Sequence, residues 1–155
     1  MYDALAESFL INNRVTLYFL SEISQEALST SLSTRGGRTV GQQFVHVCEV
    51  RRDKVARADK ELGAGLPKLA REDGHDRALL LDAITRSGAA IAELIVRSAA
   101  NDGKVKGFKR GIHALVTYLV AHDAHHRGSA MLTLKQAKVK RPDDLRFGLW
   151  DWNRI

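Results

Sequence analysis

Two histidines four residues apart are the residues of this 155-residue chain best suited to chemistry. His122 and His126 lie in the stretch IHALVTYLVAHDAHHRGSAMLT, residues 112–133. Its apolar residues recur every three or four positions without a proline, which predicts one long amphipathic helix, and the apolar stripe continues through both histidines. Side chains four apart lie one turn above each other on a helix, so both imidazoles can reach one transition-metal ion. The pair therefore predicts two ligands of a metal site on an inward-facing surface.

A third ligand must come from another segment, and His46 is the only other histidine that lies in a clear amphipathic helix of its own. That helix is predicted over residues 40–61 and begins after Thr39, whose T-x-x-Q spacing to Gln42 forms a capping box. Cys48 follows His46 by two residues, about 200° around the helix, and so cannot share its metal. We interpret Cys48 as a small packing residue.

Other polar residues beside the pair leave several roles open. The sequence HDAHH, residues 122–126, resembles the H-E-x-x-H motif of metalloproteases, in which the residue after the first histidine is the general base. Asp123 is one methylene shorter than Glu and no third protease ligand follows, so it either orients a metal ligand or is an exposed helix carboxylate. His125 could replace His126, because i, i+3 spacing also shares a helix face. Arg127 could bind a substrate anion, pair with a carboxylate or be a partly exposed structural residue. The catalytic group is undetermined, with Asp123, His125 and Arg127 as candidates.

The elements that must position these residues are all helical. Residues 3–31 and 76–100 also show a helical period, the histidine-bearing helix is expected to run on to about residue 138, and no segment shows a convincing strand pattern. The connection over residues 62–75 has no sustained period and is long enough to cross the length of a bundle. We predict a single all-α domain over residues 1–155, folded as a four-helix bundle. The tail over residues 143–155 holds both tryptophans and is expected to pack on the bundle or across a dimer interface.

Composition narrows the function classes. The chain is long enough to bury a core without disulfides, and its single cysteine excludes an internal one. Neither a secretory signal pattern nor a long uncharged apolar run is present, so we expect a cytoplasmic protein without a membrane span. The net charge of +6 permits acidic partners. However, Arg51 and the charged residues that follow it up to Glu61 alternate in sign, which indicates a solvated helix face, and no aromatic residues are interleaved for base stacking. Nucleic acid is therefore disfavoured as a partner.

Three stretches of the chain resemble the DinB-like (DinB/YfiT) four-helix-bundle metalloproteins: TVGQQFVHVCEVR, AHDAHHRGSAMLTL and the terminal GLWDW. The resemblance implies an up-down-down-up topology, with residues 62–75 as the long crossover between the second and third helices. It also implies a metal triad at His46, His122 and His126, the three residues selected above, and a homodimer. Characterised relatives include metal-dependent transferases and isomerases that use low-molecular-weight thiols.

Three neutral ligands would leave at least one coordination position of a divalent ion open, as in catalytic rather than structural sites. A bound water would be acidified there, or a thiol would be held as thiolate. We therefore expect a metal-dependent enzyme, with zinc or nickel as the first choices of metal. The resemblance implies that its first interpretation is a thiol S-transferase that uses a low-molecular-weight thiol on a small molecule. A metal-dependent hydrolase and a non-catalytic, metal-binding stress-response protein are the alternatives.

Overall fold

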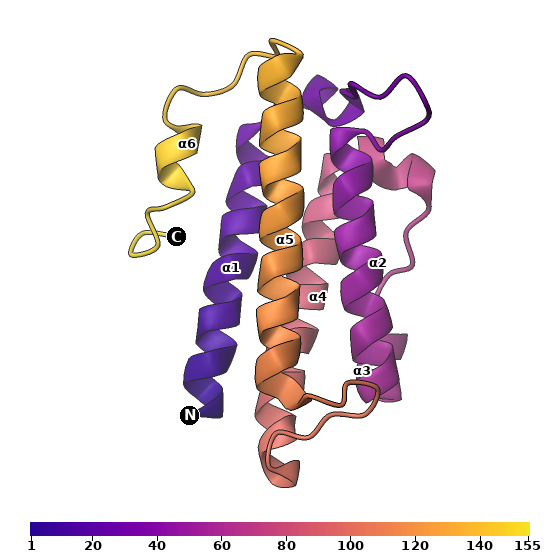
Figure 1. The fold of residues 1–155 in the computed structure, drawn as a ribbon, viewed down its shortest axis with the longest axis vertical. Coiled ribbons are helices and arrows are strands. Elements are labelled where there is room, and N and C mark those ends of the chain that lie inside the picture. Colours follow the sequence, from indigo (N-terminus) through magenta and orange to yellow (C-terminus); the bar gives the residue numbers. More distant parts are fainter.

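Four long helices lie side by side in the computed structural model, which describes residues 1–155 (Figure 1). They are α1 (Tyr2–Glu22), α2 (Val40–Ala58), α4 (Arg77–Ser98) and α5 (Gly111–Gln136). Followed from the N-terminus in Figure 1, α1 runs up, α2 and α4 both run down, and α5 runs up. The fold is therefore the predicted all-α bundle with up-down-down-up topology. None of its helices combines the length and the apolar character needed to cross a membrane.

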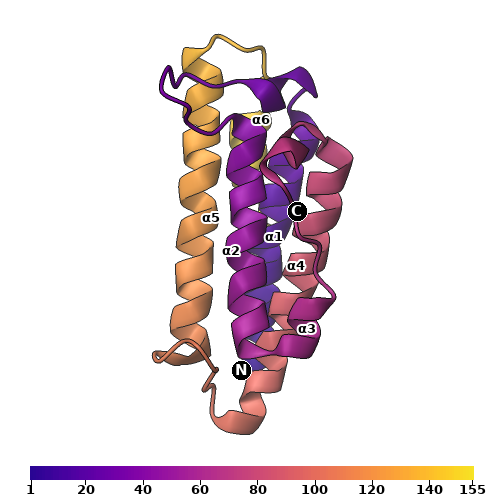
Figure 2. The same cartoon turned by 90° about the vertical axis from the view of Figure 1, so that its right-hand side faces the viewer.

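The crossover between the parallel helices α2 and α4 passes along the outside of the bundle (Figure 2). It contains two short helical segments, α3 (Lys60–Ala64) and the 3-10 turn η2 (Arg71–His75). Its far end packs directly on the start of α2, where a Cβ added to Gly41 would lie 1.6 Å from the carbonyl oxygen of Gly74. Only a residue without a side chain permits this approach.

Two helices end earlier than the periodicity predicts. α1 stops at Glu22 rather than near residue 31, because the buried Ile23 is extended (φ −82°, ψ 152°), and the chain then forms the separate 3-10 turn η1 (Glu26–Ser29). α2 stops at Ala58 rather than at residue 61, because Asp59 leaves the helical conformation. The Asp59 carboxylate accepts hydrogen bonds from the backbone N–H groups of Glu61 and Leu62 and so caps α3. A capping side chain thus interrupts a continuous helical pattern. The predicted capping box at the start of α2 is present.

The hydrophobic core consists of two clusters stacked along the bundle axis. The upper cluster contains Phe19, Phe44 and Leu80, from the ends of α1, α2 and α4 that lie at the top of Figure 1, and the lower one contains Phe9 and Ile91, from the opposite halves of α1 and α4. A layer of buried polar side chains lies at the level between them, made of Asn12, Asn13, Thr16, Arg51, Ser87 and Asp123. Burial of apolar surface on both sides of this layer is the main stabilising contribution to the fold.

The C-terminal tail folds back beside α1 and contains α6 (Leu145–Gly148) (Figure 1). Leu145 is buried and belongs to the upper core cluster, and a Cβ added to Gly148 would lie 2.2 Å from the hydroxyl oxygen of Tyr18. The larger aromatic side chains of the tail remain outside the core: Phe147, Trp150 and Trp152 are 64%, 77% and 49% exposed. The tail is therefore attached to the bundle by its aliphatic residues and not by its tryptophans.

Candidate metal centre

The predicted ligands come from two neighbouring helices, α2 and α5. On α5 the buried residues Leu115 and Leu119 are followed along the same stripe by His122 and His126, while His46 projects from α2. One nitrogen of each imidazole lies within 4.8 Å of the corresponding nitrogens of the other two. Three ligands of one tetrahedral ion at the usual distance are separated by roughly 3.3 Å, so modest side-chain rotations would bring these nitrogens to coordinating positions. These three residues could therefore bind a metal ion.

The three rings form a nearly regular triangle that is open on one side. The ring centroids are 5.2 Å apart for His46 and His122, 5.1 Å for His46 and His126, and 4.6 Å for His122 and His126. His126 is buried, whereas His46 and His122 are partly exposed to solvent. A ligand from solution could therefore reach an ion at the centre of the triangle.

Gln43 and Asp123 face the Nδ1 atoms of the two histidines on α5. His126 Nδ1 lies 3.4 Å from Gln43 Oε1, so it is placed to donate to the amide oxygen and leave Nε2 for a metal. His122 Nδ1 lies 4.0 Å from Asp123 Oδ1, and neither of these two buried atoms has a hydrogen-bond partner. The two atoms complement each other as donor and acceptor, which fits an imidazole oriented by a carboxylate while its other nitrogen coordinates a metal.

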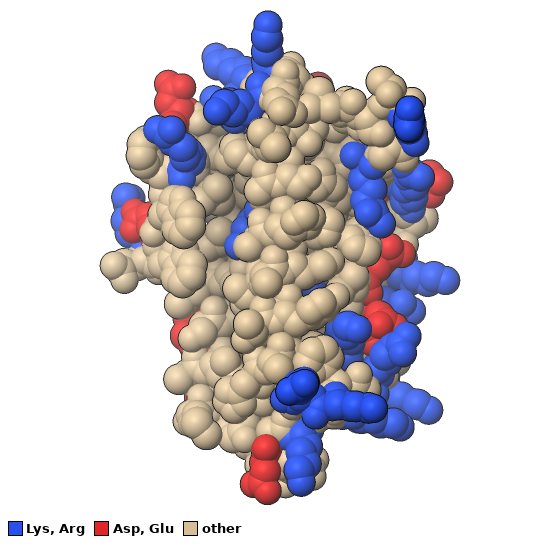
Figure 3. Space-filling model, viewed as in Figure 1, with Lys and Arg blue, Asp and Glu red and all other residues tan.

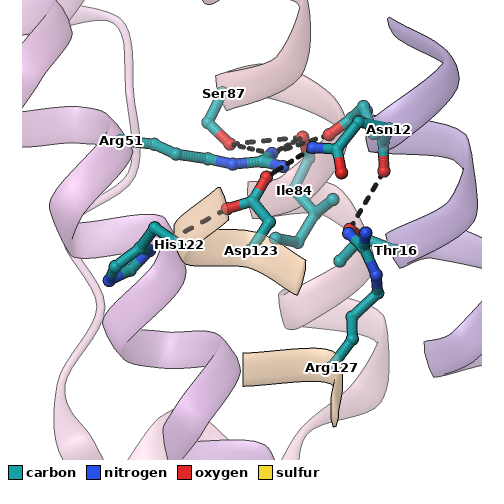
Figure 4. Close-up of polar contacts among 9 residues, drawn as sticks. Asn12, Thr16, Arg51, Ile84, Ser87, His122, Asp123 and Arg127 are labelled. Carbon is teal, nitrogen blue, oxygen red and sulfur yellow. Dashed lines mark hydrogen bonds and ion pairs between the residues drawn. The ribbon is translucent and has the colours of Figure 1, made fainter. Parts of the chain in front are cut away.

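Asp123 is not an exposed helix carboxylate, because its side chain is fully buried in an ion pair with Arg51. Asp123 Oδ2 accepts hydrogen bonds from Arg51 Nη2 at 2.6 Å and from Asn12 Nδ2 at 2.7 Å. Figure 4 shows the carboxylate lying between His122 and the Arg51 guanidinium. Burial alone would raise the pKa of Asp123, but the charge of Arg51 and the hydrogen bonds to the carboxylate lower it overall. Asp123 is therefore an ionised group fixed beside a candidate ligand.

Arg51 is also buried, contrary to the solvated face that its charged neighbours suggested. Its Nη1 donates to Asn13 Oδ1 at 2.6 Å and to Ser87 Oγ at 3.3 Å, so the guanidinium joins α1, α2, α4 and α5 (Figure 4). The guanidinium carbon also lies 5.3 Å from the centroid of the Phe9 ring. Arg51 thus has an opposite charge and several hydrogen bonds in place of the water it has lost.

The local environment favours the neutral form of two of the candidate ligands, His46 and His126. The pKa of His126 is lowered to about 4, first by burial and then by the neighbouring charges of His122, His46, His125 and Arg38. Burial also lowers the pKa of His46, with Arg38 as the next cause. At these two residues a metal would therefore meet neutral imidazoles and would not have to displace protons from them.

The remaining polar residues considered in the sequence lie outside the triangle. His125 is exposed, with its ring centroid 5.0 Å from that of His126. Arg127 Nη1 donates to Thr16 Oγ1 on α1 at 2.7 Å, which draws the guanidinium toward the other side of α5 (Figure 4). Cys48 is buried, and burial raises the pKa of its thiol to about 12, so it does not provide a thiolate at neutral pH.

Sequence reasoning missed several neighbours of the site, among them Gln43, Arg51 and Tyr118. The ring of Tyr118 stacks on His122 at a centroid distance of 5.9 Å. The burial of one of them, Arg51, could have been predicted from its position in the sequence. Arg51 lies four residues after Val47 and four before Val55, at an inward-facing position of α2. A charged residue at such a position predicts a buried partner of opposite charge.

Two cavities adjoin the triangle, and residues of the loop over residues 30–39 line both of them. The first has a volume of about 370 Å³ and is lined by Gly36, Gly37, Arg38, Gln42, Val45, His46, Glu49 and Arg71. The second, of about 310 Å³, is lined by ten residues that include Arg38, Gln43, His125 and His126. Both volumes are of the size that holds a small molecule. Each cavity thus contains at least one of the candidate metal ligands.

Comparison with known protein families gives a match over most of the chain. A model of the family described as the DinB family matches residues 1–147, nearly the whole chain. No curated protein and no solved structure matches the chain significantly. The extent of the family match, together with the helical bundle and the three clustered histidines, establishes that this chain belongs to the DinB family.

Proposed function

We propose that the chain binds a divalent transition metal through His46, His122 and His126 and acts as an enzyme on a small molecule, with thiol S-transfer as its activity. The observation that carries this proposal is the convergence of three imidazole nitrogens within 4.8 Å beside two cavities. Zinc and nickel are the metals we expect first, since imidazole suits both. Three protein ligands leave at least one position for a molecule from the cavities.

The residues around the triangle would prepare it for this chemistry. Gln43 and the Asp123 carboxylate face the outer nitrogens of the two histidines on α5 and would restrict their ring orientation. The low pKa values of His46 and His126 keep both imidazoles available as ligands. A bound metal supplies a positive charge that holds a thiol as its nucleophilic thiolate or acidifies a water.

An enzyme is favoured over a protein in which the metal only joins helices, because the bundle has its own hydrophobic core. Both core clusters draw residues from α1, α2, α4 and α5 without the candidate ligands. The three histidines lie at the edge of this core rather than replacing part of it. The fold is therefore expected to persist without metal, unlike that of a domain whose folding depends on its ion.

The first experiment is elemental analysis of the purified protein and of four single variants. His46→Ala, His122→Ala and His126→Ala are expected to lose bound metal, whereas His125→Ala is the matched control and should retain it. Metal content that ignores the first three substitutions would contradict the proposed site.

The second experiment separates catalysis from a structural role. The metal-stripped protein is expected to keep its helical circular dichroism but to lose transfer of low-molecular-weight thiols to a chromogenic electrophile, and to regain transfer with zinc or nickel. If stripping unfolds the protein while thiols and esters remain unreacted, the metal is structural. If esters are cleaved without any thiol, the activity is that of a hydrolase.

A further inference from the structure

One arginine is shared by the two cavities beside the histidine triangle. Arg38 is exposed, lies immediately before the N-cap of α2, and lines both cavities together with Gly37. His46 lines the first of these cavities with Arg38, and His126 lines the second. Arg38 is therefore close enough to the candidate ligands to act on a molecule bound there.

A second guanidinium reaches the first cavity from the crossover. Arg71, in η2, donates from Nη2 to the backbone oxygen of Gly36 at 3.0 Å, which joins the crossover to the loop over residues 30–39. Neither Arg38 nor Arg71 forms an ion pair with an acidic side chain of the chain. In Figure 3 blue side chains gather at the upper right, over this loop and the crossover. The two guanidiniums are thus available to an anion from solution.

The other residues of the first cavity also favour a polar, charged occupant. Val45 is the only hydrophobic residue among the eight that line it, and Glu49 is the only acidic one. An apolar molecule would find little surface to bury here. A guanidinium, in contrast, binds an oxyanion through two parallel N–H donors, which gives orientation as well as attraction.

We propose that Arg38, assisted by Arg71, binds an oxyanion group of the substrate. The substrate class is then a small molecule that has a carboxylate or another oxyanion at one end and, at the other, an atom that reaches the histidine triangle. The inference rests on the proposed function, because it assumes that this atom binds a metal at His46, His122 and His126. Arg38 would then be a specificity-determining residue that positions the substrate beside the metal.

The test compares two ligands of nearly the same shape, one anionic and one neutral. 3-Mercaptopropionate and its neutral amide are titrated into cobalt-loaded protein, and binding is followed by the thiolate-to-cobalt absorption. In Arg38→Gln, we expect the preference for 3-mercaptopropionate over its amide, measured as the ratio of the two dissociation constants, to fall about tenfold. Arg35→Gln is the matched control, because Arg35 belongs to the same loop and lines neither cavity. An unchanged ratio in Arg38→Gln would overturn the inference.

A measurement on metal-free protein separates failure of this inference from failure of the proposed function. Succinate and succinamide are titrated while the backbone amide resonances of Gly36, Gly37 and Arg38 are followed. Succinate alone is expected to shift them, and Arg38→Gln should abolish the shift. If cobalt does not bind but succinate does, the metal function fails and the anion subsite stands. If cobalt binds but neither ligand pair shows a preference for the anion, the subsite fails and the metal function stands. If neither cobalt nor succinate binds, both the subsite and the metal function fail.

Discussion

Replacing Asp123 by Asn would leave the guanidinium of Arg51 fully buried without an opposite charge. Both side chains are 0% exposed, and their closest atoms are 2.6 Å apart. Removing one partner of a buried ion pair destabilises a protein by about 3–5 kcal/mol, because the remaining charge has lost its hydration. The Asn side chain keeps the shape and one acceptor oxygen, so we expect a loss of about 3 kcal/mol in the free energy of unfolding. For a domain of this size, the melting temperature should fall by about 6–12 °C.

The assay is urea unfolding of metal-free protein followed by circular dichroism, so that metal binding does not contribute to stability. The matched control is Asp53→Asn, which removes the partner of Arg57 in an exposed i, i+4 pair with a closest distance of 2.8 Å. That substitution should change stability by no more than about 0.5 kcal/mol. Equal effects of Asp123→Asn and Asp53→Asn, with unchanged dependence on urea, would refute the reasoning.

A double variant tests whether Arg51 and Asp123 act as a pair. Arg51→Met removes the buried charge but leaves Asn13 Oδ1 without its donor at 2.6 Å. Combined with Asp123→Leu, it removes both charges, so the double variant should lose clearly less stability than the sum of the two single variants. Recovery should be incomplete, because Asn12 and Asn13 then lack partners for their buried polar atoms. Additive effects of the two substitutions would show that the pair is not coupled.

Three further predictions concern other parts of the chain. The pKa of His126 is about 4, below its ordinary value of 6.5, so the unfolded chain takes up a proton at a higher pH than the folded chain, and the metal-free protein should lose stability as the pH falls from 6.5 to 4. Urea unfolding at pH 7 and pH 5 should show a smaller loss of stability in His126→Gln than in wild type, and an equal loss would contradict this prediction. Gly128→Ala should raise the free energy of unfolding by about 1 kcal/mol, since an added Cβ meets nothing within 4 Å. Gly88→Ala should lower it, since its Cβ would lie 2.4 Å from the side chain of Asn13. A higher melting temperature for Gly88→Ala than for Gly128→Ala would contradict this packing. We expect a homodimer through the exposed aromatic residues of the tail. Light scattering should give twice the 17.2 kDa mass of one chain for wild type and the mass of a single chain for Trp150→Ser. A monomeric wild type would exclude the dimer.

Helical periodicity was sufficient to predict the four long helices and the crossover, because each long helix buries one stripe of apolar residues. The ends of α1 and α2 were not predictable from the same pattern. At Asp59 a side chain that caps the next segment competes with the helix, and at Ile23 the chain turns while its side chain stays in the core. Both ends depend on tertiary packing or on side-chain hydrogen bonds that a periodic pattern does not record.

The histidines were predictable for a different reason from the residues that support them. His122 and His126 are unusual residues on an apolar stripe, and this was visible without any knowledge of the partner helices. Arg38 and Gln43 come from residues about 80 positions earlier, and only the folded chain shows that they lie beside the histidines. Arg51 and Asp123 are an intermediate case, since each occupies an inward position, but their pairing depends on the packing of α2 against α5.

The buried polar layer links the stability of the bundle to the geometry of its candidate site. It interrupts the hydrophobic core at the level where Asp123 faces His122, so one carboxylate both compensates Arg51 and faces a candidate ligand. An apolar replacement of the layer could preserve the fold, because buried ion pairs are often no more stabilising than hydrophobic residues of similar size. It would also remove the carboxylate oxygen that lies 4.0 Å from His122 Nδ1. The Arg51→Met/Asp123→Leu variant should therefore bind metal about 10–100-fold more weakly than wild type even though it remains folded.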